Sequence, residues 1–201
     1  MQSPAFFDAA PVIVVADPLA AALGAAEGGL IEYRYIDAVK LAGHSCPTVA
    51  GAWLMTRAAL ARLYPGAMPQ RGEIRVELRQ SLDEAVAGVI ASVAGLVTGA
   101  ANEGGFKGLA GRYARNGLLR FGVPMRGEIR FARLDSGQSV ELTHRLQAVP
   151  RPVALNELLR DALSPQASVA SRRRFAEVWQ GWVRSIVIDH ADDPALVEFA
   201  G

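Results

Sequence analysis

Apolar and polar residues alternate in several segments of the chain, which is the pattern of strands with one buried face. In the clearest segment, Ile74, Val76 and Leu78 are separated by charged side chains. The pattern predicts strands over residues 12–15, 30–36, 73–79, 118–123, 128–134 and 139–146. We expect the last three to form an antiparallel meander, because Pro124 and residues 135–137 supply turns between them.

Helical spacing of apolar residues marks other segments. Val49, Trp53 and Leu60 recur at this spacing, whereas the segment after Ser81 and Glu84, a capping-box pair, is almost wholly apolar. The pattern predicts helices over residues 18–23, 48–63, 82–97, 155–163 and 169–188. Strands and helices follow one another without regular βαβ alternation, so we expect an α+β fold in which an antiparallel or mixed sheet packs with helices.

Breaks in the pattern divide the chain into three parts of one domain. Gly28 and Gly29 end an N-terminal arm, residues 1–28. The predicted α+β core follows as residues 29–150, and a proline-containing linker leads into residues 151–201, which we expect to be a helical extension of the same domain.

Composition and charge narrow the class of protein. Hydrophobic residues make up 51% of the chain and charged residues 20%, which is enough apolar surface for a sizeable core. The net charge of +1 gives no reason to expect nucleic acid or a membrane surface as a partner. We find no signal peptide and no apolar run long enough to span a bilayer, so we expect a cytoplasmic protein. The single cysteine, Cys46, excludes an intramolecular disulfide and an all-cysteine zinc site within one chain.

The candidate chemistry begins at residues 43–47, Gly-His-Ser-Cys-Pro, a turn at the start of a predicted helix. A histidine nitrogen and a cysteine thiolate are good ligands for zinc and later transition metals, and a helix N-terminus favours the thiolate. The same placement suits Cys46 as a nucleophile with His44 as its base. A small buried thiol beside a hydrogen-bonded histidine is equally compatible with the spacing.

The other two histidines have different settings. His144 alternates with Val140, Leu142 and Leu146, so it belongs to the inward face of its strand. A histidine there is usually a satisfied core residue, and the alternative is a ligand that enters a buried pocket from the sheet. His190 could bind a metal with its aspartate neighbours, or simply end a helix in solvent.

A glycine-rich loop, residues 98–112, contains five glycines and matches neither the Walker pattern nor the dinucleotide fingerprint. Repeated glycine lets the backbone approach a ligand closely or adopt positive φ. Asn102, Glu103 and Lys107 are the polar groups that the loop would present. A ligand-binding loop and a structural turn are both consistent with this sequence.

The Gly-His-Ser-Cys-Pro turn and the helix rich in small residues that follows resemble the FmdE-like family, which takes its name from a component of formylmethanofuran dehydrogenase. Residues 93–102, Val-Ala-Gly-Leu-Val-Thr-Gly-Ala-Ala-Asn, occupy the place of that family's second helix and its Thr-Gly stretch. The similarity covers about residues 30–123. It implies an α+β core, often in a homodimer, with a transition metal such as zinc near His44 and Cys46.

The chain departs from this family at three places. Leu96 stands where the family usually has a cysteine, and Gly88 stands where an acidic residue is expected, unless Asp83 or Glu84 takes that part. No cysteine-rich finger follows Pro150. A ligand set that differs from the family's is therefore expected.

These observations together predict a protein that binds a metal or metal cofactor, zinc or haem, in a pocket at the turn. Haem iron needs a single axial histidine or thiolate from the protein. The residues expected to line the site are His44, Cys46, His144, Asn102 and Lys107, of which His44 and Cys46 would bind the metal. A metal- or thiol-dependent enzyme acting on a small molecule is the alternative, and an accessory protein with a vestigial site is a second one.

Overall fold

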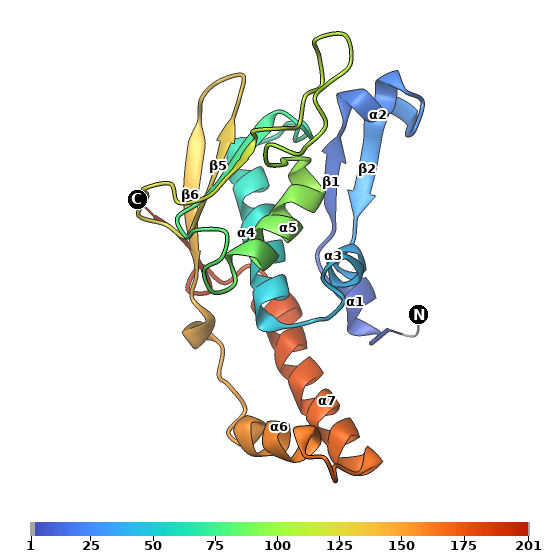
Figure 1. Ribbon diagram of the computed structural model, residues 1–201, viewed down its shortest axis with the longest axis vertical. Helices are drawn as coiled ribbons and strands as arrows, with labels where there is room; N and C mark the ends of the chain where they lie inside the picture. The colour runs from blue at the N-terminus through green and yellow to red at the C-terminus, as the bar shows by residue number, and fades with distance from the viewer. Residues whose placement is uncertain (1–2, 201) are drawn as a thin grey trace.

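Two β-sheets and the helices around them make up residues 3–200, which the computed structural model describes (Figure 1). The helices are α1 Phe6–Ala9, α2 Pro18–Ala22, α3 Tyr35–Ala42, α4 Pro47–Leu63, α5 Ala87–Thr98, α6 Leu155–Leu163 and α7 Val169–Arg184, with shorter turns η1 Glu27–Gly29, η2 Leu146–Ala148 and η3 Ser185–Asp189. The strands are β1 Ile13–Ala16, β2 Leu30–Tyr33, β3 Ile74–Leu78, β4 Leu119–Arg120, β5 Ile129–Arg133, β6 Ser139–His144 and β7 Val197–Phe199. The predicted α+β fold is confirmed.

The larger sheet has the strand order β4-β3-β5-β6-β7 and is mixed. β3, β5, β6 and β7 pair antiparallel, with Val76 opposite Phe131 and Phe131 opposite Val140. Because side chains alternate between the two faces, the apolar residues of β3 point to one side, where Ile74 and Val76 are fully buried. The strands predicted over 73–79, 128–134 and 139–146 are confirmed as β3, β5 and β6.

The predicted meander is wrong at its first strand. β4 has two residues and pairs in parallel with β3, with Val76 opposite Leu119, rather than with β5. Beyond β4 the chain stays beside β3, because the N–H of Val123 donates to the carbonyl oxygen of Leu78 at 3.0 Å. Residues 124–128 then carry the chain to the opposite edge of β3, where β5 begins.

α4 and α5 lie between the larger sheet and the β1–β2 hairpin (Figure 1). α4 is buried along most of its length, and the indole N–H of Trp53 donates to the carbonyl oxygen of Pro11 at 2.9 Å. The helix predicted over residues 82–97 begins later, at Ala87. Ala85 adopts a positive φ of 42°, which an α-helix does not accommodate, although Glu84 still accepts the N–H of Ser81 as the capping pattern predicted.

The N-terminal residues pack onto the same core. β1 pairs antiparallel with β2, and Phe7, Ile13 and Val15 are buried in the cluster that contains α4. Asp17 caps α2, the helix predicted over residues 18–23, because its Oδ1 accepts the N–H of Leu19 at 2.9 Å. The described part of the predicted N-terminal arm is therefore held by the core.

At the C-terminal end, α6 and the first half of α7 extend away from the sheet, towards the bottom of Figure 1, whereas the last turns of α7 reach the core. The π-helix η3 follows, and the chain then returns as β7 beside β6, with His144 opposite Val197. The periodicity predicted both helices but not β7. Within residues 3–200, no helix combines the length and apolarity needed to cross a membrane.

Candidate functional site

The turn at residues 43–47 joins α3 to α4, and it lies at the start of α4, as the sequence predicts. Gly43 ends α3 with a positive φ of 74°, which glycine adopts without strain. Cys46 is the N-cap of α4 and Pro47 is its first residue, where a missing N–H costs little. A glycine that stops one helix and a proline that starts the next fix the path of the turn.

The His44 side chain is exposed. Its Nδ1 lies 2.9 Å from the carbonyl oxygen of Ala42. A carbonyl oxygen accepts but does not donate, so Nδ1 carries the hydrogen and the lone pair of the neutral ring is on Nε2. Metal-bound histidines are commonly oriented by such a bond to a backbone carbonyl. His44 is the residue of this turn whose side chain could reach a metal from the solvent side.

Cys46 and Ser45 point inward instead. Both are buried, and Cys46 belongs to the hydrophobic core. The Ser45 hydroxyl lies 3.0 Å from the Tyr35 hydroxyl, whose pKa is raised mainly by burial. The carbonyl oxygen of Ser45 accepts the indole N–H of Trp179 at 2.9 Å and the amide of Gln180 at 3.2 Å. The turn is thus held by α3 on one side and by α7 on the other.

His144 lies on the inner face of β6, where the alternation predicts it. Its ring rests on Gly51 of α4 so closely that a Cβ at that position would overlap the ring. Burial lowers the pKa of His144 to about 4, and its Nε2 is buried with no hydrogen-bond partner among the described residues. The imidazole is neutral at physiological pH and packs as a core residue against α4.

The described residues do not gather the predicted ligands into one cluster. His44 is exposed, Cys46 is in the core and His144 lies against Gly51. Within residues 3–200, no group of three or more His, Cys, Asp and Glu side chains is placed to hold a metal ion. A site that takes all its ligands from these residues is therefore not formed.

A groove of about 350 Å³ runs along the exposed side of α5. Its floor is made of short side chains on one helix, including Gly88, Ser92 and Gly95. Its walls come from Leu96 near the end of α5, from the end of α3, from the loop before α5, from the glycine loop and from β4 with the residue that follows it; the lining residues outside α5 are Leu41, Leu82, Ala100, Ala101, Asn102, Leu119 and Phe121. The groove is mostly apolar.

The glycine loop contributes to this groove unevenly. Asn102 lines it, and its side-chain oxygen accepts the N–H of Gly104 at 3.0 Å, so the residue also shapes the loop. Lys107 is exposed further along the loop and is not among the residues that line the groove. The glycine loop is therefore both a turn and one wall of a cavity.

A buried ion cluster that the sequence did not reveal anchors this loop. Asp17 accepts Arg71 at one carboxylate oxygen and Arg115 at the other, each at 2.7 Å. Burial alone would raise the pKa of Asp17, but hydrogen bonds from Arg71 and Ala20 and the charge of Arg115 hold that pKa below its ordinary value. The Arg115 guanidinium occupies the space where a Cβ on Gly72 would lie. Periodicity carries no information on a contact between residues 98 positions apart, so the sequence does not predict the pairing of Asp17 with Arg115.

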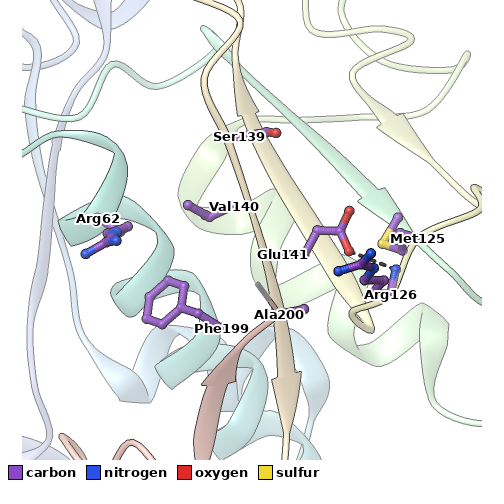
Figure 2. A pocket seen from close by; sticks show the side chains of 8 residues that line it. All are labelled: Arg62, Met125, Arg126, Ser139, Val140, Glu141, Phe199 and Ala200. Carbon is purple, nitrogen blue, oxygen red and sulfur yellow. Dashed lines mark hydrogen bonds between the residues drawn. The ribbon is translucent and has the colours of Figure 1, made fainter.

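A larger cavity lies elsewhere, beside β6 and β7, and measures about 570 Å³ (Figure 2). Glu141 is its acidic group, and its carboxylate accepts the N–H groups of Gly127 and Arg126 and the Arg130 guanidinium. The Gly127 N–H is the main cause of the lowered pKa of Glu141, and the bond from Arg130 adds to it. A carboxylate so fully engaged is a poor general base, so this cavity is a weaker candidate site than the α5 groove.

The groove coincides with the two positions at which the chain departs from the family it resembles. Gly88 and Leu96 both line it, and neither can bind a metal. The geometry thus places an apolar surface where the resemblance implies an acidic residue and a thiol. Compared with known proteins, the chain matches no family model, and no curated protein is significantly similar to it in sequence.

Proposed function

We propose that this chain binds a metal-containing organic cofactor in the groove along α5, with His44 as the ligand to the metal. The observation that carries this proposal is that Leu41, near the end of α3, lines the groove and precedes His44 by three residues. The Nδ1 of His44 is held by the carbonyl oxygen of Ala42. A ligand that lies on α5 would therefore have a metal-binding nitrogen within the adjoining turn.

The donor set favours haem or a similar macrocycle over a bare zinc ion. Structural zinc takes four protein ligands and catalytic zinc takes three, whereas haem iron can be held by one histidine. No three-residue ligand group lies within residues 3–200. The short side chains of Gly88, Ser92 and Gly95 leave a low apolar floor on which a flat ring can lie.

The groove also bears on the resemblance to the FmdE-like family. We infer that the chain has the core of the FmdE-like family, with its metal site remodelled into an apolar groove. Leu96 and Gly88 support this inference, because they replace two groups of the resemblance with apolar surface. The homodimer that the resemblance implies is part of the proposal, and light scattering of the purified protein measures it.

Titration of the purified protein with hemin tests the proposal, because axial ligation by histidine changes the Soret band. We expect saturable binding to the natural chain and loss of the shifted band in His44→Ala. His190→Ala is the matched control, since it removes another histidine outside the core, and it should bind as the natural chain does. Ser92→Leu should weaken binding by filling the groove, whereas Ser92→Ala should not.

Two outcomes contradict the proposal. The first is hemin binding that survives His44→Ala, and the second is the absence of saturable binding in a folded natural chain. Metal analysis of protein purified without chelator or histidine tag is the parallel measurement. Stoichiometric zinc that disappears in His44→Ala or Cys46→Ser would instead support a site of the kind found in the family.

A second candidate is an accessory protein with a vestigial site. It is favoured by one observation, the burial of Cys46 in the core, where it cannot act as an open nucleophile or ligand without a movement of the turn. This role predicts that the His44→Ala, Cys46→Ala double variant is folded and still binds its partner. The thiol-dependent enzyme, the remaining alternative, predicts that Cys46→Ser alone abolishes turnover.

A further inference from the structure

A smaller cavity, of about 210 Å³, lies between α4, the turn after η3 and β7. Ala58 and Ala61 of α4 and Val197 and Phe199 of β7 give it apolar walls. The cavity is separate from the α5 groove, with which it shares no lining residue. In this cavity an apolar wall and a replaceable ion pair occur together.

Arg57 is the cation of this cavity. Its guanidinium donates to the carboxylate of Asp192 at 2.6 Å and to the carbonyl oxygen of Ala191 at 3.4 Å. The side chain of Arg57 is 34% exposed, whereas that of Asp192 is 81% exposed. Ion pairs with so exposed a partner contribute little to stability, so another carboxylate can take the place of Asp192 at modest cost.

The neighbouring aspartate does not compete for Arg57. Asp193 accepts His190 Nδ1 at 2.8 Å and the N–H of Ala195 at 2.8 Å. The bond from His190 is the main cause of the lowered pKa of Asp193, so its carboxylate stays ionised and engaged. Arg62, which lies over the Phe199 ring at 5.9 Å, adds a second positive charge near this wall.

The backbone that forms the cavity has an uncommon geometry. η3, Ser185–Asp189, is a π-helical turn, closed by the N–H of His190 donating to the carbonyl oxygen of Ser185 at 3.0 Å. The wider turn leads directly into residues 191–194, which line the cavity. Single π-turns are rare in proteins and are often found at functional sites.

We propose that this cavity binds a small apolar monocarboxylate, whose carboxylate replaces Asp192 on Arg57 and whose hydrocarbon part fills the space between α4 and β7. The volume equals that of about seven water molecules, which suits an acid with about seven non-hydrogen atoms. A branched short-chain acid such as 3-methylbutanoate has this size. This inference does not depend on the cofactor proposed for the α5 groove.

Titration of the full chain with 3-methylbutanoate, followed by calorimetry or by the amide chemical shifts of Ala191, Asp192, Asp193 and Ala195, tests this proposal. The neutral 3-methylbutanamide and the cationic 3-methylbutylamine are the matched probes. We expect saturable binding of the acid, at least about tenfold tighter than either probe, because a charge-assisted bond to Arg57 is lost with them. Arg57→Gln should lower the affinity for the acid about tenfold or more and leave that for the amide unchanged.

Asp192→Asn gives a prediction of opposite sign in a variant that should fold normally. Removing the competing carboxylate should raise the affinity for the acid by up to about fivefold. Ala61→Leu should abolish binding of both acid and amide by filling the cavity, with thermal unfolding as the check on folding.

Four results would overturn the proposal. They are no saturable binding of the acid, equal binding of acid and amide, an amine that binds more tightly than the acid, and an affinity that Asp192→Asn lowers or leaves unchanged.

Discussion

The two histidines that the sequence brings forward, His44 and His144, both lie close to the first half of α4 but differ in what they can do. His44 is exposed, and its Nδ1 is held by the carbonyl oxygen of Ala42. His144 is pressed against Gly51, and its buried Nε2 has no partner among residues 3–200. One ring offers a lone pair to the outside, and the other is part of the packing.

The same difference divides the other polar groups of the molecule into those that can bind a ligand and those that hold the fold together. An exposed side chain that is oriented by a hydrogen bond to the backbone is available to a ligand, and His44 is such a side chain. A group that is enclosed determines how elements pack, as His144 does between β6 and α4 and Asp17 does beneath the glycine loop. The comparison predicts large stability effects at the enclosed groups and small ones at the exposed groups.

The largest effect is expected at Asp17. Asp17→Asn keeps an oxygen for capping α2 but leaves Arg71 and Arg115 without a buried counter-charge. Breaking a buried ion pair in this way costs about 3–5 kcal/mol of unfolding free energy. Urea unfolding measures it, and Asp192→Asn, at an exposed pair, is the control with a cost below about 1 kcal/mol. Equal costs for the two variants would contradict the comparison.

The next effect is a pH dependence that belongs to His144. Its pKa is about 4 in the fold against an ordinary 6.5, so between these pH values the unfolded chain binds a proton that the fold does not. Stability is therefore complete above about pH 6.5 and falls as the pH drops towards 4, by up to about 3 kcal/mol. Unfolding free energies measured across this range should vary less steeply in His144→Gln. A slope in His144→Gln as steep as that of the natural chain would contradict this role of His144.

Gly51→Ala should have a smaller effect that reports on the same contact. The added methyl group overlaps the His144 ring, and such overpacking costs about 1–3 kcal/mol. Thermal unfolding measures the loss. The His144→Ala change should remove most of this cost in the double variant, since the overlapping ring is then absent. Independent, additive costs would show that His144 does not determine the residue at position 51.

The sequence predicted the elements well because periodicity reports burial on each segment separately. β3, β5, β6 and α6 follow from alternation or helical spacing, and Gly43 and Pro47 mark the turn between α3 and α4. The parallel pairing of β4 with β3 was missed, because a two-residue strand has no periodicity from which its partner can be read. η3 and β7 were also missed, because both depend on where the chain returns to the sheet and neither has a local pattern of its own.

The sequence predicted the turn at residues 43–47, but not how its side chains divide between the surface and the core. His44, Ser45 and Cys46 are consecutive, and only the fold determines that the first is exposed while the other two are buried. Gly88 and Leu96 were noted as departures from a resemblance, and the structure shows that they line one groove. The partners of Asp17 could not be found from the sequence, because ion pairs between distant segments leave no local pattern.

The smallest effect on stability is expected at His44, and it is the sharpest test of the comparison. His44→Ala removes an exposed ring and one hydrogen bond to Ala42, so the unfolding free energy should change by no more than about 0.5 kcal/mol. The same variant should lose the hemin spectrum described above. A variant that keeps its stability but loses the hemin spectrum would show that His44 binds the ligand and does not stabilise the fold. A loss of more than about 1 kcal/mol would instead mean that the bond to Ala42 holds the turn, and then His44 would belong with His144 among the residues that serve the fold.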